Sequence, residues 1–329
     1  GEATTLTIDS NQGAVSVPTL TAAKATSLSI VGDGAVTVGG TDATTTLLAT
    51  IDASTSSGGV TIAGNVDLTS TANVTLGTAA DTLTLDILTE SNVVVNAGEH
   101  ATSDTGVNDA LALAGANNQG LTVVDLSSTT DQVTQVNGAV NAAAITNFEN
   151  ITLSGLTGSQ TASVTGSDEA NVIIGTANAD TILGGKGADT ITMGDGTDTV
   201  LGEAGDDIFV VLDENDIVAG GNVEDTITGG DDTADTLHFD TTSGAQTYAN
   251  TVDFGTATGL EKITMAASAN ALSLTVKADF VSDTGITTFD LSGDTTTGGT
   301  NVLNLVALTS NSTVTIIGSA GADTITSGT

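Results

Sequence analysis

A nine-residue rhythm between residues 166 and 228 constrains the fold of this chain more than any other feature. Residues 184–192 (Gly-Gly-Lys-Gly-Ala-Asp-Thr-Ile-Thr) fit the pattern G-G-x-G-x-D-x-U-x at every specified position. In steps of nine, the sixth position is an acid or its amide, at Asn171, Asp180, Asp189, Asp198, Asp207, Asp216 and Asp225. The eighth position is apolar throughout, from Ile173 to Ile227. After a one-residue insertion, Gly229-Gly230 leads to Asp235, which predicts an eighth turn.

This rhythm predicts a coil in which each nonapeptide supplies one tight turn and one short strand. Two nonapeptides close a circuit, so alternate turns stack on the same edge. The glycines of the turns are expected to adopt backbone angles that other residues avoid and to aim carbonyl oxygens inward. The central ones are Gly175, Gly185, Gly187, Gly194, Gly196 and Gly205. The predicted fold class is all-β: a parallel β-roll or β-solenoid, flanked by β-rich solenoid or sandwich modules.

The stacked acids predict a calcium site in each pair of turns. Neighbouring strands lie about 4.8 Å apart, so one cation could contact the carboxylates of two stacked turns. Hard oxygen ligands in flexible loops favour calcium over zinc. The best pairs are Asp180 with Asp198 and Asp189 with Asp207. The alternative is that these aspartates are solvated turn residues of a metal-free solenoid.

Weaker sites are predicted where the turn departs from the pattern. Asn171 is neutral, Asp216 follows a turn without glycine, and Val223 replaces a glycine before Asp225. Without metal, the ladder of like charges costs on the order of 1 kcal/mol per pair in water, and more when it is partly buried. Calcium binding energy then becomes folding energy, so we expect the roll not to form in calcium-poor solution.

The composition narrows the possible partners. The chain carries 4 Lys and Arg against 40 Asp and Glu, a formal charge of −36. Such a surface repels nucleic acid and anionic membranes and attracts divalent cations. There is no cysteine, which excludes disulfides and thiolate metal sites. The sequence contains no apolar run of about 18 residues, so no transmembrane helix is predicted. Residues 1–4 show no signal-peptide pattern.

The chain is predicted to contain four parts: a Thr/Ala/Val-rich β module (1–165), the calcium-binding roll (166–240), a second β-rich module (241–317) and the start of a truncated second block (318–329). In the first part, residues 28–30 and 36–38 flank Gly32-Asp33-Gly34, which predicts a hairpin. Strand-like runs every eight to twelve residues or so fit a sandwich or an irregular solenoid. Residues 109–116 fit a helical turn or a strand.

Looser repetitions occur outside the roll. An apolar-Asp-x-Ser pattern at residues 51–54, 124–127 and 289–292 fits either an Asp-led turn at a strand end or a metal ligand. Residues 77–83 resemble one shortened nonapeptide without a stacked partner, and we expect them to bind nothing tightly. Residues 148–153 resemble residues 260–265, which suggests a duplication.

The second block is the clearest of these repetitions. Residues 173–182 nearly recur as 316–325, with Asp323 at the acid position. The recurrence predicts that the intact protein continues and repeats this layout.

Catalytic signatures are missing from the sequence. A metalloprotease motif H-E-x-x-H needs paired histidines, but His100 and His238 are each isolated. There is no G-x-S-x-G elbow, no phosphate-binding G-x-x-x-x-G-K and no cysteine nucleophile. We expect no enzymatic activity from this chain.

With these repeats in hand, residues 166 to about 240 and 318–326 resemble the RTX proteins of Gram-negative bacteria. That family includes toxins, proteases, lipases, adhesins and surface-layer proteins, typically exported by type I secretion. The resemblance implies several calcium ions and an extracellular location. The flanking modules are most similar in composition to RTX surface-layer proteins, which implies a structural segment of the bacterial cell surface that self-associates into a lattice. Cell-surface polysaccharide is a further candidate partner. The alternatives are the stalk or binding region of an adhesin, and the non-catalytic roll of a secreted enzyme.

Overall fold

The computed structural model describes most of the chain in two compact units, Gly1–Thr165 and Gly166–Thr329. The described residues are 4–22, 24–41, 48–63, 66–86, 92–98, 108–213, 216, 218–219, 222–223, 225–241, 244–248, 254, 256–267, 270–295, 300–308 and 313–327. For residues 116–119, 218–219 and 222–223, only the backbone is described. The predicted boundaries at residues 240 and 317 fall inside the second unit.

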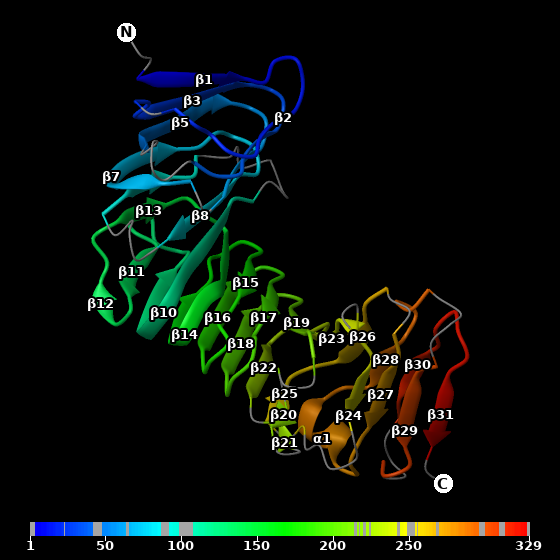
Figure 1. The fold of residues 1–329 in the computed structure, drawn as a ribbon. Helices are drawn as coiled ribbons and strands as arrows, with labels where there is room; N and C mark the ends of the chain where they lie inside the picture. The colour runs from blue at the N-terminus through cyan, green and yellow to red at the C-terminus, as the bar shows by residue number, and fades with distance from the viewer. Residues whose placement is uncertain are drawn as a thin grey trace. The chain divides into compact units, whose positions relative to one another are not determined.

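The first unit is a solenoid of two parallel sheets between which the chain alternates (Figure 1). One sheet contains β1 (Thr5–Asp9), β3 (Ser27–Gly32), β5 (Leu48–Ser56), β7 (Leu68–Thr75), β9 (Val94–Asn96) and β13 (Ala144–Thr146). The other contains β2 (Val15–Val17), β4 (Val36–Val38), β6 (Val60–Ile62), β8 (Thr82–Asp86), β10 (Ala110–Asp125) and β14 (Asn150–Thr165). An antiparallel pair, β11 (Val133–Val136) and β12 (Ala139–Val140), joins the edge of β10.

Columns of identical or similar apolar side chains hold this solenoid in register. Leu28 lies opposite Ile51, and Ile51 lies opposite Val74, and all three are at most 1% exposed. Burying such a side chain stabilises the fold by about 1.5–3 kcal/mol. A slip of one residue would turn the whole column outward, so the alternation of apolar and Thr or Ser residues fixes the pairing.

Three expectations for this unit can now be decided. The hairpin prediction was wrong: β3 and β4 belong to different sheets, and each pairs in parallel with a strand one circuit away. The glycine turn between them, with Gly32 at φ +114°, carries the chain from one sheet to the other and not back along the same sheet. Residues 110–116 are strand, and the unit is a solenoid, not a sandwich.

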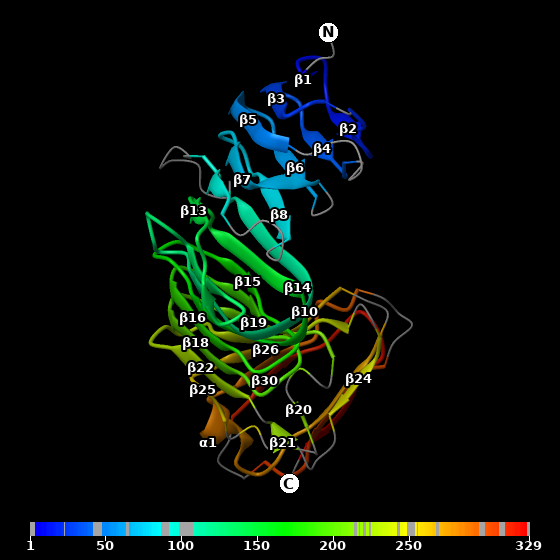
Figure 2. The same ribbon diagram turned by 60° about the vertical axis from the view of Figure 1, so that its left-hand side comes forward.

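The second unit is also built from parallel strands, arranged in three sheets. The first sheet contains β15 (Val172–Ile174), β17 (Thr190–Thr192), β19 (Ile208–Val211), β23 (Thr236–Phe239), β26 (Lys262–Met265), β28 (Thr288–Asp290) and β30 (Thr315–Ile317). The second contains β16 (Thr181–Lys186), β18 (Thr199–Ala204), β22 (Thr226–Gly230) and β25 (Ala257–Thr258). The third, on another side of the unit from β26 and β30 (Figure 2), contains β24 (Gln246–Tyr248), β27 (Leu272–Thr275), β29 (Val302–Leu305) and β31 (Thr324–Ser327).

Two smaller elements complete the second unit. The short strands β20 (Val218–Ala219) and β21 (Asn222–Val223) form an antiparallel pair, and α1 (Phe280–Thr284) is the one helix among the described residues. Among those residues, no helix has the length and apolar character needed to cross a membrane.

The predicted circuit of two nonapeptides is observed only in the first part of the roll. Ile173 lies opposite Ile191 and Ile191 opposite Phe209, each eighteen residues apart, and all three are fully buried. The next partner of Phe209 is Leu237, because the pair β20–β21 and its flanking residues lengthen this circuit. The nine-residue steps therefore continue in the sequence beyond the point where the strands follow them. The all-β parallel roll and solenoid predicted from the sequence is confirmed.

Candidate metal centre

Apart from Asp216, the predicted acids of the roll form two ladders, one on each edge, in which a backbone N–H of one circuit donates to the carboxylate of the next circuit. On one edge, Asn171 N–H donates to Asp189 Oδ1 at 2.8 Å and Asp189 N–H donates to Asp207 Oδ1 at 2.8 Å. On the other edge, Asp180 N–H donates to Asp198 Oδ1 at 2.7 Å. The two best pairs expected from the sequence are therefore stacked neighbours, and all five side chains are buried.

The second carboxylate oxygen faces a backbone carbonyl across a glycine. A Cβ added at Gly184 would lie 2.5 Å from Asp189 Oδ2 and 2.7 Å from the carbonyl oxygen of Gly202 in the next circuit. At Gly202, a Cβ would come closer than 3.0 Å to Asp207 Oδ2 and to the carbonyl oxygen of Gly229. We call this space, bounded by a carboxylate oxygen and a carbonyl oxygen and left open by the missing Cβ, a glycine cradle.

Further cradles of the same kind occur at the start of the roll. At Gly175, the added Cβ would lie 2.7 Å from Asp180 Oδ2 and also close to the carbonyl oxygen of Met193. At Gly166, the amide oxygen of Asn171 replaces the carboxylate at 2.7 Å. The cradle therefore repeats on both edges, with the neutral residue at the end of the ladder.

Four carboxylates of the ladders lack the donors that buried acids normally have. The Oδ2 atoms of Asp189, Asp198, Asp207 and Asp235 are buried and find no hydrogen-bond donor among the described residues. Burial raises the pKa of Asp189 to about 7, of Asp198 to about 8 and of Asp207 to about 6, with smaller contributions from neighbouring acids. Each site thus holds an oxygen that requires a cation or a proton.

Calcium fits this donor set. It takes six to eight oxygen ligands, carboxylate and carbonyl alike, in flexible geometry. The cradles offer only oxygen donors, and the residues that would hold the ion there are Asp180, Asp189 and Asp207 with the carbonyl groups of Met193, Gly202 and Gly229. Asp198 has Met193 at the position of the cradle glycine and offers its buried Oδ2 without a cradle. The observed arrangement differs from the expected one in one respect. In each stacked pair, the Oδ1 of the second aspartate accepts a backbone N–H, so a carbonyl oxygen takes the place expected for the second carboxylate.

In the lengthened circuit, two aspartates, Asp216 and Asp225, occupy different positions. Asp198 N–H donates to Asp225 Oδ1 at 2.8 Å, so Asp225 continues the ladder. Asp216 Oδ2 instead accepts N–H groups of its own turn, from Leu212 and Asp213. Oxygens of Asp216, Asp213 and Asp195 lie within 4.8 Å of one another, a grouping that the sequence did not suggest. Burial raises the pKa of Asp216, and the charges of Asp213 and Asp195 add to the effect.

The remaining predicted site residues are Asp235, Asp323 and the glycines of the turns. Asp207 N–H donates to Asp235 Oδ1 at 2.8 Å, one circuit beyond the regular repeats. Asp323, in the second block, accepts Ser319 N–H at 2.8 Å and an Asn301 side-chain N–H at 3.1 Å. The left-handed backbone region between φ +91° and +143° is occupied by Gly185, Gly187, Gly194, Gly196 and Gly205, as expected. Gly175 was expected there too, but its φ is not positive; it lacks a Cβ where Asp180 Oδ2 approaches.

A scan of protein-family models gave a match to the RTX calcium-binding nonapeptide repeat (four copies) at residues 165–200, 193–227 and 314–329. These segments are RTX calcium-binding repeats. The matched residues contain the ladder residues from Asn171 to Asp225, and also Asp323 of the second block. Comparisons with curated proteins and with solved structures gave no significant match. The chain thus contains RTX repeats, which imply calcium binding.

A second acid ladder lies in the first unit, outside the RTX repeats. Asp81 N–H donates to Asp109 Oδ1 at 2.7 Å, and Asp109 N–H donates to Glu149 Oε2 at 2.7 Å. The expectation that residues 77–83 have no stacked partner was therefore wrong. The partners were missed because 28 and 40 residues separate them along the chain. Asp81 itself accepts N–H groups from Gly77 and Val60, so its two oxygens are engaged by the backbone.

The apolar-Asp-x-Ser segments share one local hydrogen-bond arrangement. In each, the aspartate Oδ1 accepts both the N–H and the hydroxyl of the serine two residues later, at Asp52, Asp125 and Asp290. The turns at Asp125 and Asp290 end β10 and β28, whereas Asp52 and Ser54 lie within β5. The structure favours the turn interpretation over a metal role.

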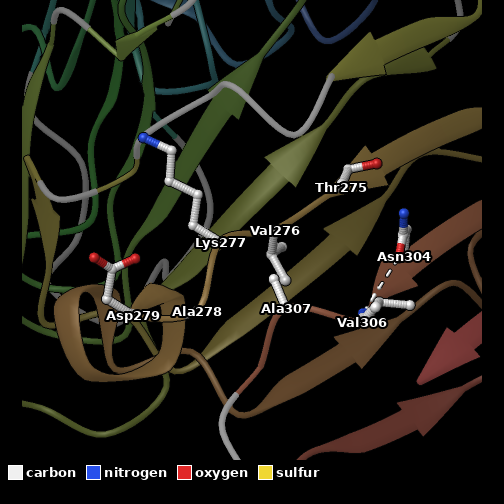
Figure 3. Close-up of a pocket in the computed structure, with 8 residues that line it drawn as sticks. All are labelled: Thr275, Val276, Lys277, Ala278, Asp279, Asn304, Val306 and Ala307. Atoms are coloured by element: carbon white, nitrogen blue, oxygen red, sulfur yellow. Dashed lines mark hydrogen bonds between the residues drawn. The ribbon is translucent and has the colours of Figure 1, made fainter. Parts of the chain in front are cut away.

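Two features away from the RTX ladders show no catalytic arrangement among the described residues. His238 lies in β23, where its Nδ1 contacts Thr264 Oγ1 at 2.7 Å and burial lowers its pKa. His100 lies outside the described residues. An open pocket of about 480 Å³ is lined by residues 275–279, 304, 306 and 307 (Figure 3). Its only charged lining residues are Lys277 and Asp279, and it contains none of the predicted site residues.

Proposed function

We propose that this chain is a calcium-dependent structural segment of a bacterial surface layer, in which calcium folds the roll and also bridges acidic surfaces of neighbouring copies. The observation that carries the proposal is the repeated glycine cradle, where a buried carboxylate oxygen without a donor faces a carbonyl oxygen. A fold that needs calcium at each circuit is ordered only where calcium is plentiful, as it is outside the cell. The formal charge of −36 supports bridging by divalent cations.

Export by type I secretion, an extracellular location and the absence of catalytic activity belong to this proposal. RTX repeat proteins are typically secreted. A chain without cysteine and stabilised by metal is suited to export in the unfolded state, because folding begins only when calcium is met. Contacts to cell-surface polysaccharide would anchor the layer.

The folding part of the proposal is tested by far-UV circular dichroism of the full chain in calcium and in excess chelator. We expect β content to fall in chelator and to return on addition of calcium. Asp189→Asn and Asp198→Asn are expected to shift the calcium midpoint upward, whereas Asp168→Asn is the control, because Asp168 is exposed and paired with Lys186. Equal midpoints for all variants would remove the ladder acids from the sites.

The assembly part is tested separately by electron microscopy of the purified chain with added calcium. An ordered two-dimensional sheet supports the surface-layer role. Isolated elongated particles would contradict lattice formation and favour the alternative, the stalk of an RTX adhesin. Catalytic residues in adjoining sequence would favour the third possibility, the calcium-binding roll of a secreted enzyme.

A further inference from the structure

A duplicated segment ends the acid ladder in both units. In the second unit, Glu261 Oε2 accepts the N–H of Asp235 at 2.9 Å, and in the first unit Glu149 Oε2 accepts the N–H of Asp109 at 2.7 Å. Two residues before each glutamate, the backbone is left-handed, at Gly259 with φ +64° and at Asn147 with φ +66°. The glutamate follows its left-handed residue at the same two-residue spacing at which Asp189 follows Gly187 and Asp207 follows Gly205.

One more glycine cradle lies at the end of the ladder in the second unit. A Cβ added at Gly229 would lie 2.5 Å from Asp235 Oδ2 and also very close to the carbonyl oxygen of Gly259. Asp235 is fully buried, and its Oδ2 finds no donor among the described residues. This is the same oxygen pair that Asp189 and Asp207 present earlier in the roll.

This cradle lies beyond the matched repeats, which end at residue 227 before resuming at 314. The strand spacing there is 28 residues from Thr236 back to Ile208 and 26 residues forward to Lys262, so no nonapeptide register relates its two sides. The carboxylates of Asp235 and Glu261 carry charge into this space, and Asp206 and Asp232 lie near enough to interact with them electrostatically.

We propose that Asp235, the carbonyl group of Gly259 and Glu261 form a further calcium site that joins the RTX roll to the strands that follow it. The inference rests on the proposed calcium dependence of the roll. The site holds β23 and β26 together, because Asp235 immediately precedes β23 and Glu261 immediately precedes β26. Calcium therefore orders the chain past residue 240 as well as the repeats themselves.

The chain carries its own reporter of this junction. Tyr248 is the single tyrosine, and there is no tryptophan. Tyr248 is 1% exposed and its ring lies 5.0 Å from that of Phe239, at the end of β23. Near-UV circular dichroism or tyrosine fluorescence thus reports packing at the junction, whereas far-UV circular dichroism reports the sheets of the whole chain.

The test is a calcium titration of the full chain followed by the Tyr248 signal, together with the number of bound ions from native mass spectrometry. We expect Asp235→Asn to bind one calcium fewer than the unmodified chain and to move the Tyr248 midpoint to at least tenfold higher calcium. Glu261→Gln is expected to move the midpoint in the same direction by a smaller factor. The control is Glu169→Gln, since Glu169 is an exposed glutamate on a turn of the roll.

The outcomes separate this inference from the proposed function. An unchanged ion count in Asp235→Asn, with a Tyr248 midpoint equal to that of Glu169→Gln, overturns the junction site while leaving the roll intact. If the fold of the unmodified chain showed no dependence on calcium at all, the proposed function on which the inference rests would be overturned instead. If Asp235→Asn fails to fold, the smaller change in Glu261→Gln decides the question.

Discussion

In the absence of calcium, the roll is expected to become more stable as the pH falls. In the folded state, the pKa values of Asp189, Asp198 and Asp207 are about 7, 8 and 6 because their carboxyl groups are buried. In the unfolded chain an aspartate has a pKa of about 3.9. A carboxyl group whose pKa is raised by folding binds a proton more tightly in the folded state. Its protonation therefore favours folding at low pH, and this contribution is lost as the pH rises through about 6 to 8.

The size of the effect follows from the same values. At pH 9 all three groups are ionised in both states, and at about pH 5.5 only the folded state is protonated at these positions. The three folded-state pKa values lie about 1.5, 2.5 and 0.5 above pH 5.5. At 1.36 kcal/mol per pH unit, acidification stabilises the metal-free roll by about 6 kcal/mol. This is comparable with the whole stability of a small domain.

The assay is far-UV circular dichroism of the metal-free chain in chelator between pH 9 and 5.5, with urea titrations at each pH. The double variant Asp189→Asn and Asp198→Asn is expected to lose most of the response of these three groups, to about 1 kcal/mol, because Asp207 is the only one of the three that still titrates. Asp168→Asn, at an exposed position, retains the full response. A metal-free roll that is equally stable at both pH values, or more stable at pH 9, would refute the reasoning.

Three further predictions follow from the cradles and ladders. Gly202→Ala places a methyl group in a cradle, and the backbone at Gly202 is not left-handed, so the substitution adds no backbone strain. It is expected to weaken calcium binding, measured by calorimetry, at least tenfold. The control Gly244→Ala, at a glycine with open space around it, is expected to leave the affinity unchanged. Asp225→Ala leaves Asp198 N–H without its acceptor and is expected to lower stability in saturating calcium by about 1–3 kcal/mol, measured by urea unfolding; an unchanged midpoint would exclude Asp225 from the ladder. Magnesium at equal concentration is expected not to restore β content, because it requires shorter, octahedral coordination; equal recovery by magnesium would contradict a calcium-type site.

The repeat predicted the parallel roll and its stacked acids well, because position six and position eight have opposite physical demands. An apolar residue such as Ile191 must be buried, and a charged residue such as Asp189 must meet a ligand, so their spacing reports the circuit directly. The same spacing did not reveal the longer circuit after Phe209. The nine-residue steps continue in the sequence through Asp216, although Asp216 does not belong to the ladder. Only strand pairing shows that Asp225, and not Asp216, lies beneath Asp198.

The partners of the carboxylates could not be read from the sequence. Every residue has a backbone carbonyl group, so the sequence does not show that the carbonyl oxygens of Gly202 and Met193 are the ones that face an aspartate oxygen. The ladder in the first unit was missed for a related reason. Asp81, Asp109 and Glu149 are separated by unequal stretches of chain, and only the solenoid brings them into line. The likeness of residues 148–153 to 260–265 was visible, but its structural role required the hydrogen bonds of the two glutamates.

The most direct test of the central claim is a crystal structure of residues 1–329 grown in calcium, with anomalous data that locate the metal. Anomalous peaks are expected beside Gly184 and Gly202, each within contact of an aspartate Oδ2 and a carbonyl oxygen of the next circuit. A roll that is fully ordered in excess chelator, with the cradles empty and Asp189 and Asp207 unchanged, would contradict the claim.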